Sequence, residues 1–182
     1  MANTSLTDYI VVIDDVLSPS DCTALIERFE ASDKIEKAEL KDGFSFTQLD
    51  ITAAWPDRQE TLVKVFLEQA AAYQRRVEAY FWPPSFAFEH LRMKRYLPDG
   101  RDCFPPHVDV MDQRAARRFL AAMIYLNAPE AGETVFPHLN KTITPAPGRL
   151  VCFPPLWLFP HEGVAPRAGP KYILNTYLCY PN

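Results

Sequence analysis

The sequence has little glycine and no cysteine pairs at metal-binding spacing. Only 6 of its 182 residues are glycine, and its four cysteines lie far apart without a C-x-x-C motif. Scattered cysteines are typical of small buried side chains in a reducing compartment, and they argue against a disulfide framework or a thiolate zinc site. We therefore expect a cytoplasmic protein whose cysteines are structural.

The sequence also lacks an excess of basic residues and any long hydrophobic run. The formal net charge is −4 at pH 7, which predicts no broad positive surface for nucleic acid. The N-terminal apolar stretch has no basic residues before it and is interrupted by Asp14 and Asp15. No other run approaches the roughly 18 apolar residues of a membrane span. We expect neither a nucleic-acid nor a membrane partner, and the sequence makes no prediction of oligomeric state.

Proline, by contrast, is abundant. It supplies 17 of the 182 residues, roughly twice its usual share of about 5%, and most of it lies in the second half. That distribution is typical of many strand ends and turns. A chain of this length can bury one substantial core, so we expect a single domain over residues 1–182.

Two helices are predicted in the first half, after a short strand in "DYIVVIDDVL". Ser18 can cap the first helix, Pro19 suits its first position, and Asp21 completes a capping box. The second helix follows "WPDRQE", and its apolar side chains recur on one face as far as about Tyr80. Helical support is therefore expected over about 18–80.

From Phe86 onward the pattern changes to short strands separated by turn residues. Helices followed by a run of strands indicate an α+β fold, with helices packed against one side of a sandwich or barrel. The β core is expected over about 86–180. Its predicted strands are "FAFEHLRMKRYL", "HVDV", "FLAAMIYLN", "GETVFP", "ITPAPGRLVCFP", "PHEGVA" and "KYILNTYLCY".

The segment "HVDV" places an imidazole and a carboxylate two residues apart. In a strand, His107 and Asp109 would point to the same face. A second imidazole, His161, follows fifty-two residues after Asp109. Two histidines and one carboxylate can occupy one face of an octahedral Fe(II) ion and leave three positions open, whereas catalytic zinc keeps only one.

Lys171 opens the strand "KYILNTYLCY", ten residues after His161. By alternation Asn175 and Tyr177 share its face, and they are candidates for lining a substrate pocket. A lysine that faces inward needs a carboxylate partner, because an unpaired buried charge is costly. A solvent-exposed strand end is the alternative.

The strand "FAFEHLRMKRY" is unusually basic. If Tyr96 points into the barrel, then Lys94, Arg92 and His90 share its face, and an inward pair of cations would suit an acidic substrate group. Arg92 is accordingly a candidate for the substrate pocket. The alternative is a basic edge that faces water. The run "DQRAARRF" is predicted to be a solvated loop, or a lid that closes over substrate.

The segments "RYLPDG", "HVDV", "FLAAMIYLN", "GETVFP", "PAPGRLVCFP" and "HEGVAPRAGPKYILNTYL", in this order and spacing, resemble the Fe(II)- and 2-oxoglutarate-dependent dioxygenases, specifically their prolyl 4-hydroxylase-like group. The resemblance covers residues 96–178. It implies a double-stranded β-helix core (a jelly roll, cupin-like), with the N-terminal helices packed on one sheet.

The resemblance also implies roles for individual residues. His107, Asp109 and His161 match the iron ligands, and Lys171 matches the residue that binds the distal carboxylate of 2-oxoglutarate. Tyr125 and Tyr96 match two tyrosines of the cosubstrate pocket. The sequence departs from the family in "AGETVF", where Ala131 precedes Gly132 in place of a Gly-Gly pair.

The implied reaction is hydroxylation of an unactivated C–H bond, with oxidative decarboxylation of 2-oxoglutarate to succinate and carbon dioxide. Fe(II), 2-oxoglutarate and O2 are the implied cofactors and cosubstrates, with ascorbate as a supporting reductant. The expected substrate is a prolyl residue of a peptide or protein, or a free amino acid or similar small molecule. Related halogenases replace the carboxylate ligand with a small residue, so the presence of Asp109 favours hydroxylation.

Two other functions remain open from the residues alone. A noncatalytic cupin-like module that binds a metal or small ligand would keep the barrel and some histidines, but it would not need Lys171. A zinc hydrolase could use His107, Asp109 and His161 with a different chemistry.

Overall fold

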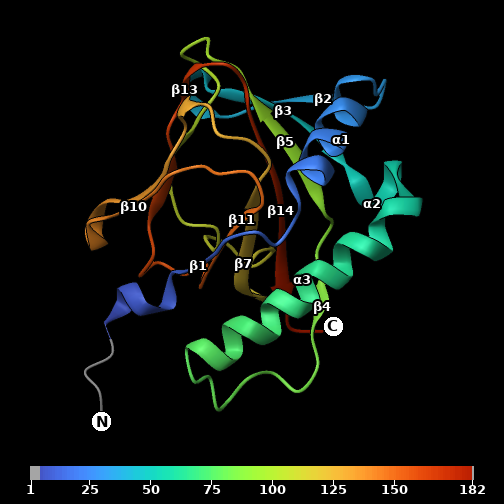
Figure 1. Cartoon of the computed structure of the whole chain (residues 1–182). Helices are drawn as coiled ribbons and strands as arrows, with labels where there is room; N and C mark the ends of the chain where they lie inside the picture. Colours follow the sequence, from blue (N-terminus) through green and yellow to red (C-terminus); the bar gives the residue numbers. More distant parts are fainter. Residues whose placement is uncertain (1–4, 182) are drawn as a thin grey trace.

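Two facing antiparallel sheets form the centre of the molecule in the computed structural model, which describes residues 5–181 (Figure 1). The larger sheet has the order β1 (Val11–Ile13), β11 (Arg149–Phe153), β7 (Arg118–Tyr125), β14 (Lys171–Cys179), β5 (Arg92–Tyr96), β3 (Ser45–Asp50) and β2 (Glu36–Glu39), and β4 (Ala87–Phe88) pairs with β14. The smaller sheet has the order β10 (Lys141–Ile143), β9 (Thr134–Phe136), β12 (His161–Gly163) and β6 (Phe104–His107). A separate pair joins β8 (Glu130–Ala131) to β13 (Pro166–Ala168).

The helices cover the outer face of the larger sheet (Figure 1). They are α1 (Pro19–Glu30), the short α2 (Ile51–Ala54) and α3 (Pro56–Arg76), with 3-10 turns η1 (Leu6–Tyr9), η2 (Lys41–Gly43) and η3 (Pro137–Leu139). Among the helices of residues 5–181, none has the length and apolar character that crossing a membrane requires.

Both predicted helices are present, and each differs in one detail. Ser18 caps α1 by accepting a hydrogen bond from the Asp21 backbone N–H. The Asp21 carboxylate accepts from the Ser18 hydroxyl, so the second half of the predicted capping box is replaced by a side-chain bond. Helix α3 ends at Arg76 instead of about Tyr80 because Glu78 adopts a positive φ of 50°, which breaks the helical path.

Alternation along the strands of the larger sheet creates two cores. On the helix side, Met93, Ile124 and Leu174 pack against apolar residues of α1 and α3. On the inner side, Tyr125 and Ile173 pack against Phe136 of the smaller sheet. Successive side chains of a strand point to opposite faces, so one sheet supports the helices with one face and walls the barrel with the other.

The predicted fold class is confirmed: the protein has an α+β fold with a jelly-roll core and helices on one sheet. The expected division into helices and β core is too simple, because β1, β2 and β3 of the first half belong to the larger sheet. The predicted strand "HVDV" is wrong, since β6 ends at His107 and Asp109 lies in a bend. The basic segment "FAFEHLRMKRYL" splits into β4 and β5.

Candidate functional site

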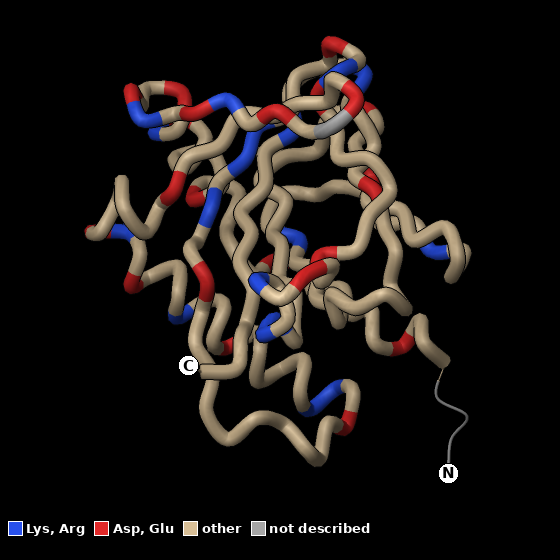
Figure 2. Tube along the Cα trace, turned by 180° about the vertical axis from the view of Figure 1, so that it is seen from behind, with Lys and Arg blue, Asp and Glu red and all other residues tan. Residues whose placement is uncertain are grey.

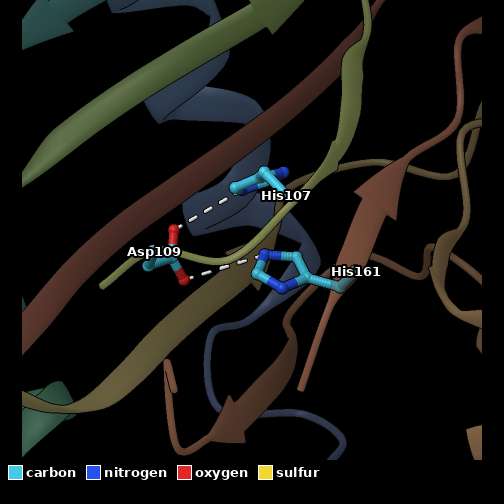
Figure 3. Close-up of side chains that lie close together, drawn as sticks. All are labelled: His107, Asp109 and His161. Carbon is cyan, nitrogen blue, oxygen red and sulfur yellow. Dashed lines mark ion pairs between the residues drawn. The ribbon is translucent and has the colours of Figure 1, made fainter. Parts of the chain in front are cut away.

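Two imidazoles and one carboxylate converge at the interior of the barrel (Figure 3). His107 is the last residue of β6 and lies opposite His161, the first residue of β12. Asp109 follows His107 in the chain, and its two carboxylate oxygens lie 3.5 Å from Nε2 of His107 and 3.7 Å from Nε2 of His161. One potential ligand atom from each residue lies within 4.8 Å of the other two, so together they could hold a metal ion.

Backbone hydrogen bonds orient both imidazoles toward the centre. Nδ1 of His107 donates to the carbonyl of Pro105 at 2.8 Å, and Nδ1 of His161 donates to the carbonyl of Phe159 at 3.0 Å. In a neutral imidazole this leaves the lone pair of Nε2 directed at the centre of the group. Two lone pairs and a carboxylate that converge in this way repel one another unless a cation lies between them.

Aromatic rings enclose this group. The ring of His107 lies 4.1 Å from the ring of Phe104, and that of His161 lies 4.7 Å from Phe153, measured between centroids. Burial lowers the pKa of His161 and so favours its neutral, ligating form. Burial raises the pKa of Asp109, but hydrogen bonds and the neighbouring imidazoles outweigh it, and the net pKa lies below the usual value.

Tyr177 and Arg118 hold Asp109 from the other side. The Tyr177 hydroxyl donates to Oδ1 of Asp109 at 2.6 Å, and the Arg118 guanidinium lies 3.9 Å from the centre of the Tyr177 ring. Arg118 also donates to the backbone carbonyl of Asp109 at 3.2 Å and forms a two-fold salt bridge with Glu89. These contacts fix the orientation of the carboxylate, as outer partners of metal ligands commonly do.

The group opens onto a cavity that contains about 570 Å³ of empty space, part of it open to solvent. Lys171 lies in its wall, and only 2% of the residue is exposed. Its Nζ donates to the carbonyls of Gly132 and Val164 and lies 4.6 Å from the centre of the Tyr96 ring. Burial lowers the pKa of Lys171 to about 8.

Close packing fixes the position of the Lys171 side chain. A Cβ added to Gly132 would lie 3.0 Å from Cδ of Lys171, and the backbone of Gly132 has a φ of 87°. Only glycine satisfies both conditions easily. Ala131, which stands where the resemblance expects glycine, also adopts a positive φ of 63°, a conformation that costs an L-residue about 1 kcal/mol.

The two predicted cosubstrate tyrosines occupy different places. Tyr96 lines the cavity beside Lys171. Tyr125 is fully buried behind the wall, where its hydroxyl shares a 2.5 Å hydrogen bond with the hydroxyl of Thr134, which does line the cavity. Tyr125 therefore does not line the cavity itself and is connected to it by the hydrogen bond to Thr134.

The Lys171 ammonium and the Asn175 side-chain oxygen are both buried in the wall without an ionic or hydrogen-bond partner, in the described part of the chain, of the kind that such groups need. Their surroundings therefore test whether the cavity suits iron and 2-oxoglutarate. Within residues 5–181, no carboxylate pairs with Lys171, although a buried ammonium needs one. Oδ1 of Asn175 is buried and accepts no hydrogen bond from the described residues. The converging lone pairs suit a divalent cation, and the unpaired ammonium suits the distal carboxylate of a diacid. The residues present fit both groups.

The structure brings most of the sequence-predicted residues to the cavity. Asn175, Tyr177 and the three residues of the metal-binding group line it, as do Lys171 and Tyr96. Arg92, a candidate for the substrate pocket, is not among the lining residues, whereas its neighbour Lys94 is. His90 lies at the surface, where it pairs with Asp50.

The sequence prediction missed Arg118 and Phe104. The run "DQRAARRF" was expected to be a solvated loop or a lid, yet its Arg118 is the first residue of β7 and contacts both Asp109 and Tyr177. Phe104 packs on His107 three residues before it. Neither contact can be predicted from the hydrophobic periodicity of a helix or a strand.

Comparison with known proteins agrees with the geometry. The family profile described as the 2OG-Fe(II) oxygenase superfamily matches residues 91–179. This range contains the metal-binding group and Lys171. No curated protein sequence matches the chain.

Solved structures show a similar fold along nearly the whole chain. One is the viral collagen prolyl hydroxylase of Paramecium bursaria chlorella virus-1 in complex with 2OG, at 23% identity and a TM-score of 0.69, covering 96% of this chain and 97% of that one. A Pseudomonas putida prolyl-4-hydroxylase is 19% identical, with a TM-score of 0.70 and 97% of each chain covered.

A third similar structure is a Trichoplax adhaerens prolyl hydroxylase in complex with a peptide fragment of the hypoxia inducible factor oxygen degradation domain. It is 17% identical, with a TM-score of 0.73, covering 95% of this chain and 84% of that one. Residues 91–179 thus match the profile of the 2OG-Fe(II) oxygenase superfamily, and the chain has the fold of the prolyl hydroxylases.

Proposed function

We propose that His107, Asp109 and His161 bind Fe(II), that Lys171 binds the distal carboxylate of 2-oxoglutarate, and that the protein hydroxylates a prolyl residue of a peptide. One observation carries the proposal. The same cavity that is walled by the converging lone pairs of the metal-binding group also contains a buried ammonium without a carboxylate partner.

The spacing of the two subsites supports this assignment. A Cβ added to Gly163 would lie 3.5 Å from Nζ of Lys171, and Gly163 lies two residues after His161 in β12. Two residues of strand span roughly 6–7 Å, which is the scale of a five-carbon diacid that bridges a metal and a lysine.

Several residues of the cavity then have definite tasks. Bound iron and 2-oxoglutarate supply the oxidation, which yields succinate, carbon dioxide and a hydroxylated product. Lys171 neutralises the distal carboxylate while the ring of Tyr96 covers the ammonium. Tyr177 holds the Asp109 carboxylate in place by its hydrogen bond, and the apolar wall, which includes Phe104, Phe153 and Ile173, limits access of water.

Exposed apolar side chains next to the cavity support a peptide substrate. The backbone N–H of Val110 donates to the carbonyl of Pro155 at 3.1 Å and so joins the segments that follow Asp109 and Phe153. These segments carry Met111 and Trp157, which are 78% and 75% exposed. Exposed apolar groups beside a binding cavity are typical of sites that dock a larger partner.

Turnover with defined substrates tests the proposal. The purified protein, loaded with Fe(II), 2-oxoglutarate and ascorbate, is incubated with proline-containing peptides or with free L-proline and other amino acids. We expect succinate together with a mass gain of one oxygen atom on a prolyl residue of the peptide, and neither product with the His161→Ala variant. Hydroxylation confined to a free amino acid would overturn the peptide assignment, and succinate production that His161→Ala leaves intact would overturn the ligand assignment.

A further inference from the structure

The cavity contains a second lysine that the proposed cosubstrate site does not use. Lys94 lies on β5, a strand with basic residues in close succession (Figure 2), and it pairs in register with Ile173 of β14. Its side chain joins Lys171 and Asp109 in the wall of the cavity. Its Nζ lies 4.8 Å from the ring centre of Phe46 and 5.3 Å from that of Phe104.

These two rings are the only partners of the Lys94 ammonium among residues 5–181. No carboxylate of the described residues lies within 4.0 Å of it, and none of their oxygens accepts a hydrogen bond from it. Burial lowers the pKa of Lys94 to about 8, while the negative charge of Asp109 acts in the opposite direction. At neutral pH the group is therefore still largely a cation, held in an apolar wall without a counter-ion.

Asn175 offers a second unpaired polar group beside it. Lys94 is paired directly with Ile173, so Asn175 is its diagonal neighbour on β14, at a distance of about 7–8 Å between backbones. Both side chains line the cavity, and the buried Oδ1 of Asn175 lacks a hydrogen bond from the described residues. The Lys94 ammonium and the Asn175 amide are therefore placed to bind the same small polar group in the cavity.

The balance of charge indicates which group this is. Asp109, Lys94 and Lys171 are the only charged side chains in the described wall of the cavity, and their charges sum to +1. Fe(II) adds two positive charges and 2-oxoglutarate adds two negative charges. One positive charge therefore remains after the metal and the cosubstrate are bound, and a buried net charge is costly unless a counter-ion pairs with it.

We propose that Lys94, with Asn175 beside it, forms a second carboxylate subsite that binds a carboxylate group of the substrate. This inference rests on the proposed function, since it takes Fe(II) and 2-oxoglutarate as the other occupants of the cavity. The carboxylate is either the free carboxylate of an amino acid or the side chain of an acidic residue next to the target proline in a peptide. Both sources present the same group to Lys94.

Equilibrium binding to the complete but unreactive enzyme tests the subsite. The protein is loaded with Mn(II) in place of iron and with 2-oxoglutarate under anaerobic conditions, and two matched pairs of probes are titrated by calorimetry. The first pair is L-proline and L-prolinamide. The second pair is a short blocked peptide containing Pro-Asp and the same peptide containing Pro-Asn.

We expect the carboxylate member of at least one pair to bind the wild-type protein at least about tenfold more tightly than its amide, as a charge-assisted hydrogen bond predicts. In Lys94→Met this ratio should fall to about one, while the Kd for 2-oxoglutarate changes less than about twofold. Asn175→Leu should weaken binding of the same probe by a smaller factor. The pair that responds identifies the source of the carboxylate.

Lys64→Met provides the control, because Lys64 is exposed on α3 and pairs with Glu60. It should leave every ratio unchanged. The subsite is refuted if neither carboxylate probe is preferred by the wild-type protein, including the case in which none of the probes binds. It is also refuted if Lys94→Met raises the Kd for 2-oxoglutarate tenfold and leaves the probe ratios intact, since Lys94 would then bind the cosubstrate. Failure of 2-oxoglutarate to bind the Mn(II) protein at all would instead contradict the proposed function.

Discussion

The two faces of β14 (Lys171–Cys179) differ in the groups that they contact. On one face, Leu174 and Leu178 pack against the helices in an apolar core. On the other, Lys171, Asn175 and Tyr177 line the cavity. Adjacent residues of a strand point to opposite sides. Residues that stabilise the core and residues that line the cavity therefore alternate along the nine residues of β14 but lie on opposite faces of the sheet. Stability and chemistry should therefore respond to different substitutions.

The largest effect is expected from the cavity side. His161→Ala removes one of three proposed ligands, and loss of even an outer partner of a ligand typically costs 10–100-fold in metal affinity or activity. We expect succinate formation to fall at least about a thousandfold, beyond that range, while the thermal unfolding temperature changes by only a few degrees. Anaerobic Fe(II) titration and a turnover assay measure this. Comparable activity in the variant would show that the chemistry lies elsewhere.

The opposite face should show the reverse pattern. Leu174→Ala deletes a side chain that is fully buried among the helices, and such truncations cost about 2–5 kcal/mol of unfolding free energy. Urea denaturation gives this loss, and the Kd for 2-oxoglutarate should stay within about twofold. A large change in that Kd, with little loss of stability, would mean that the two faces are coupled.

Lys171→Met separates cosubstrate binding from metal binding. It removes the ammonium proposed to hold the distal carboxylate, and a hydrogen bond to a charged group contributes about 1.5–3 kcal/mol. The Kd for 2-oxoglutarate should therefore rise roughly 10–100-fold, whereas Fe(II) affinity should hardly change. An unchanged Kd for 2-oxoglutarate would remove Lys171 from the proposed site.

The cavity lysines also predict a pH dependence of stability in the metal-free protein. The folded pKa of Lys171 is about 8, and an unfolded lysine has a pKa of about 10.4. Between these values the unfolded chain binds more protons, so the free energy of unfolding rises with pH, by up to about 3 kcal/mol for Lys171. Burial raises the pKa of tyrosines and of Cys152, and their contribution to stability falls over the same range. Urea unfolding of wild type and Lys171→Met from pH 7 to 11 isolates the contribution of Lys171, and the difference in unfolding free energy, wild type minus variant, should rise with pH. A difference that stays constant or falls across this window would contradict the burial of the charge.

The smallest of these effects is expected from Tyr177→Phe. The substitution keeps the ring under Arg118 but removes the hydroxyl that donates to Asp109. We expect about tenfold weaker Fe(II) binding, as for other partners of metal ligands, with no change in the Kd for 2-oxoglutarate measured at saturating metal. Weakening by less than twofold would mean that Arg118 alone suffices to hold the carboxylate.

The parts of the fold that follow from local chemistry could be predicted from the sequence. Ser18 and Pro19 mark the start of α1, and alternation assigns the two faces of β14. The sequence predicts no strand over 36–50. Within this segment β2 is polar and mostly exposed, so it shows no alternation of apolar and polar residues. Its place in the sheet depends on pairing with distant strands, which a local pattern does not encode.

The candidate site shows the same division. Residue types and their spacing pointed to His107, Asp109 and His161, and the structure brings them together even though Asp109 lies in a bend instead of the predicted strand. Alternation identified the inward face of β5 but treated Arg92 and Lys94 alike. Only the three-dimensional arrangement distinguishes them, because the cavity reaches Lys94 and not Arg92.

If one cavity binds a ferrous ion and 2-oxoglutarate together, the two should form a coloured complex in the protein. Anaerobic titration of the Fe(II)-loaded protein with 2-oxoglutarate, followed by visible absorption, detects that complex. We expect a weak visible band in the wild-type protein, a higher 2-oxoglutarate requirement for the same band in Lys171→Met, and no band in His161→Ala. A wild-type protein that binds Fe(II) but gives no band with 2-oxoglutarate, or a His161→Ala variant that forms the band equally well, would show that the cavity does not bind the two together through these residues.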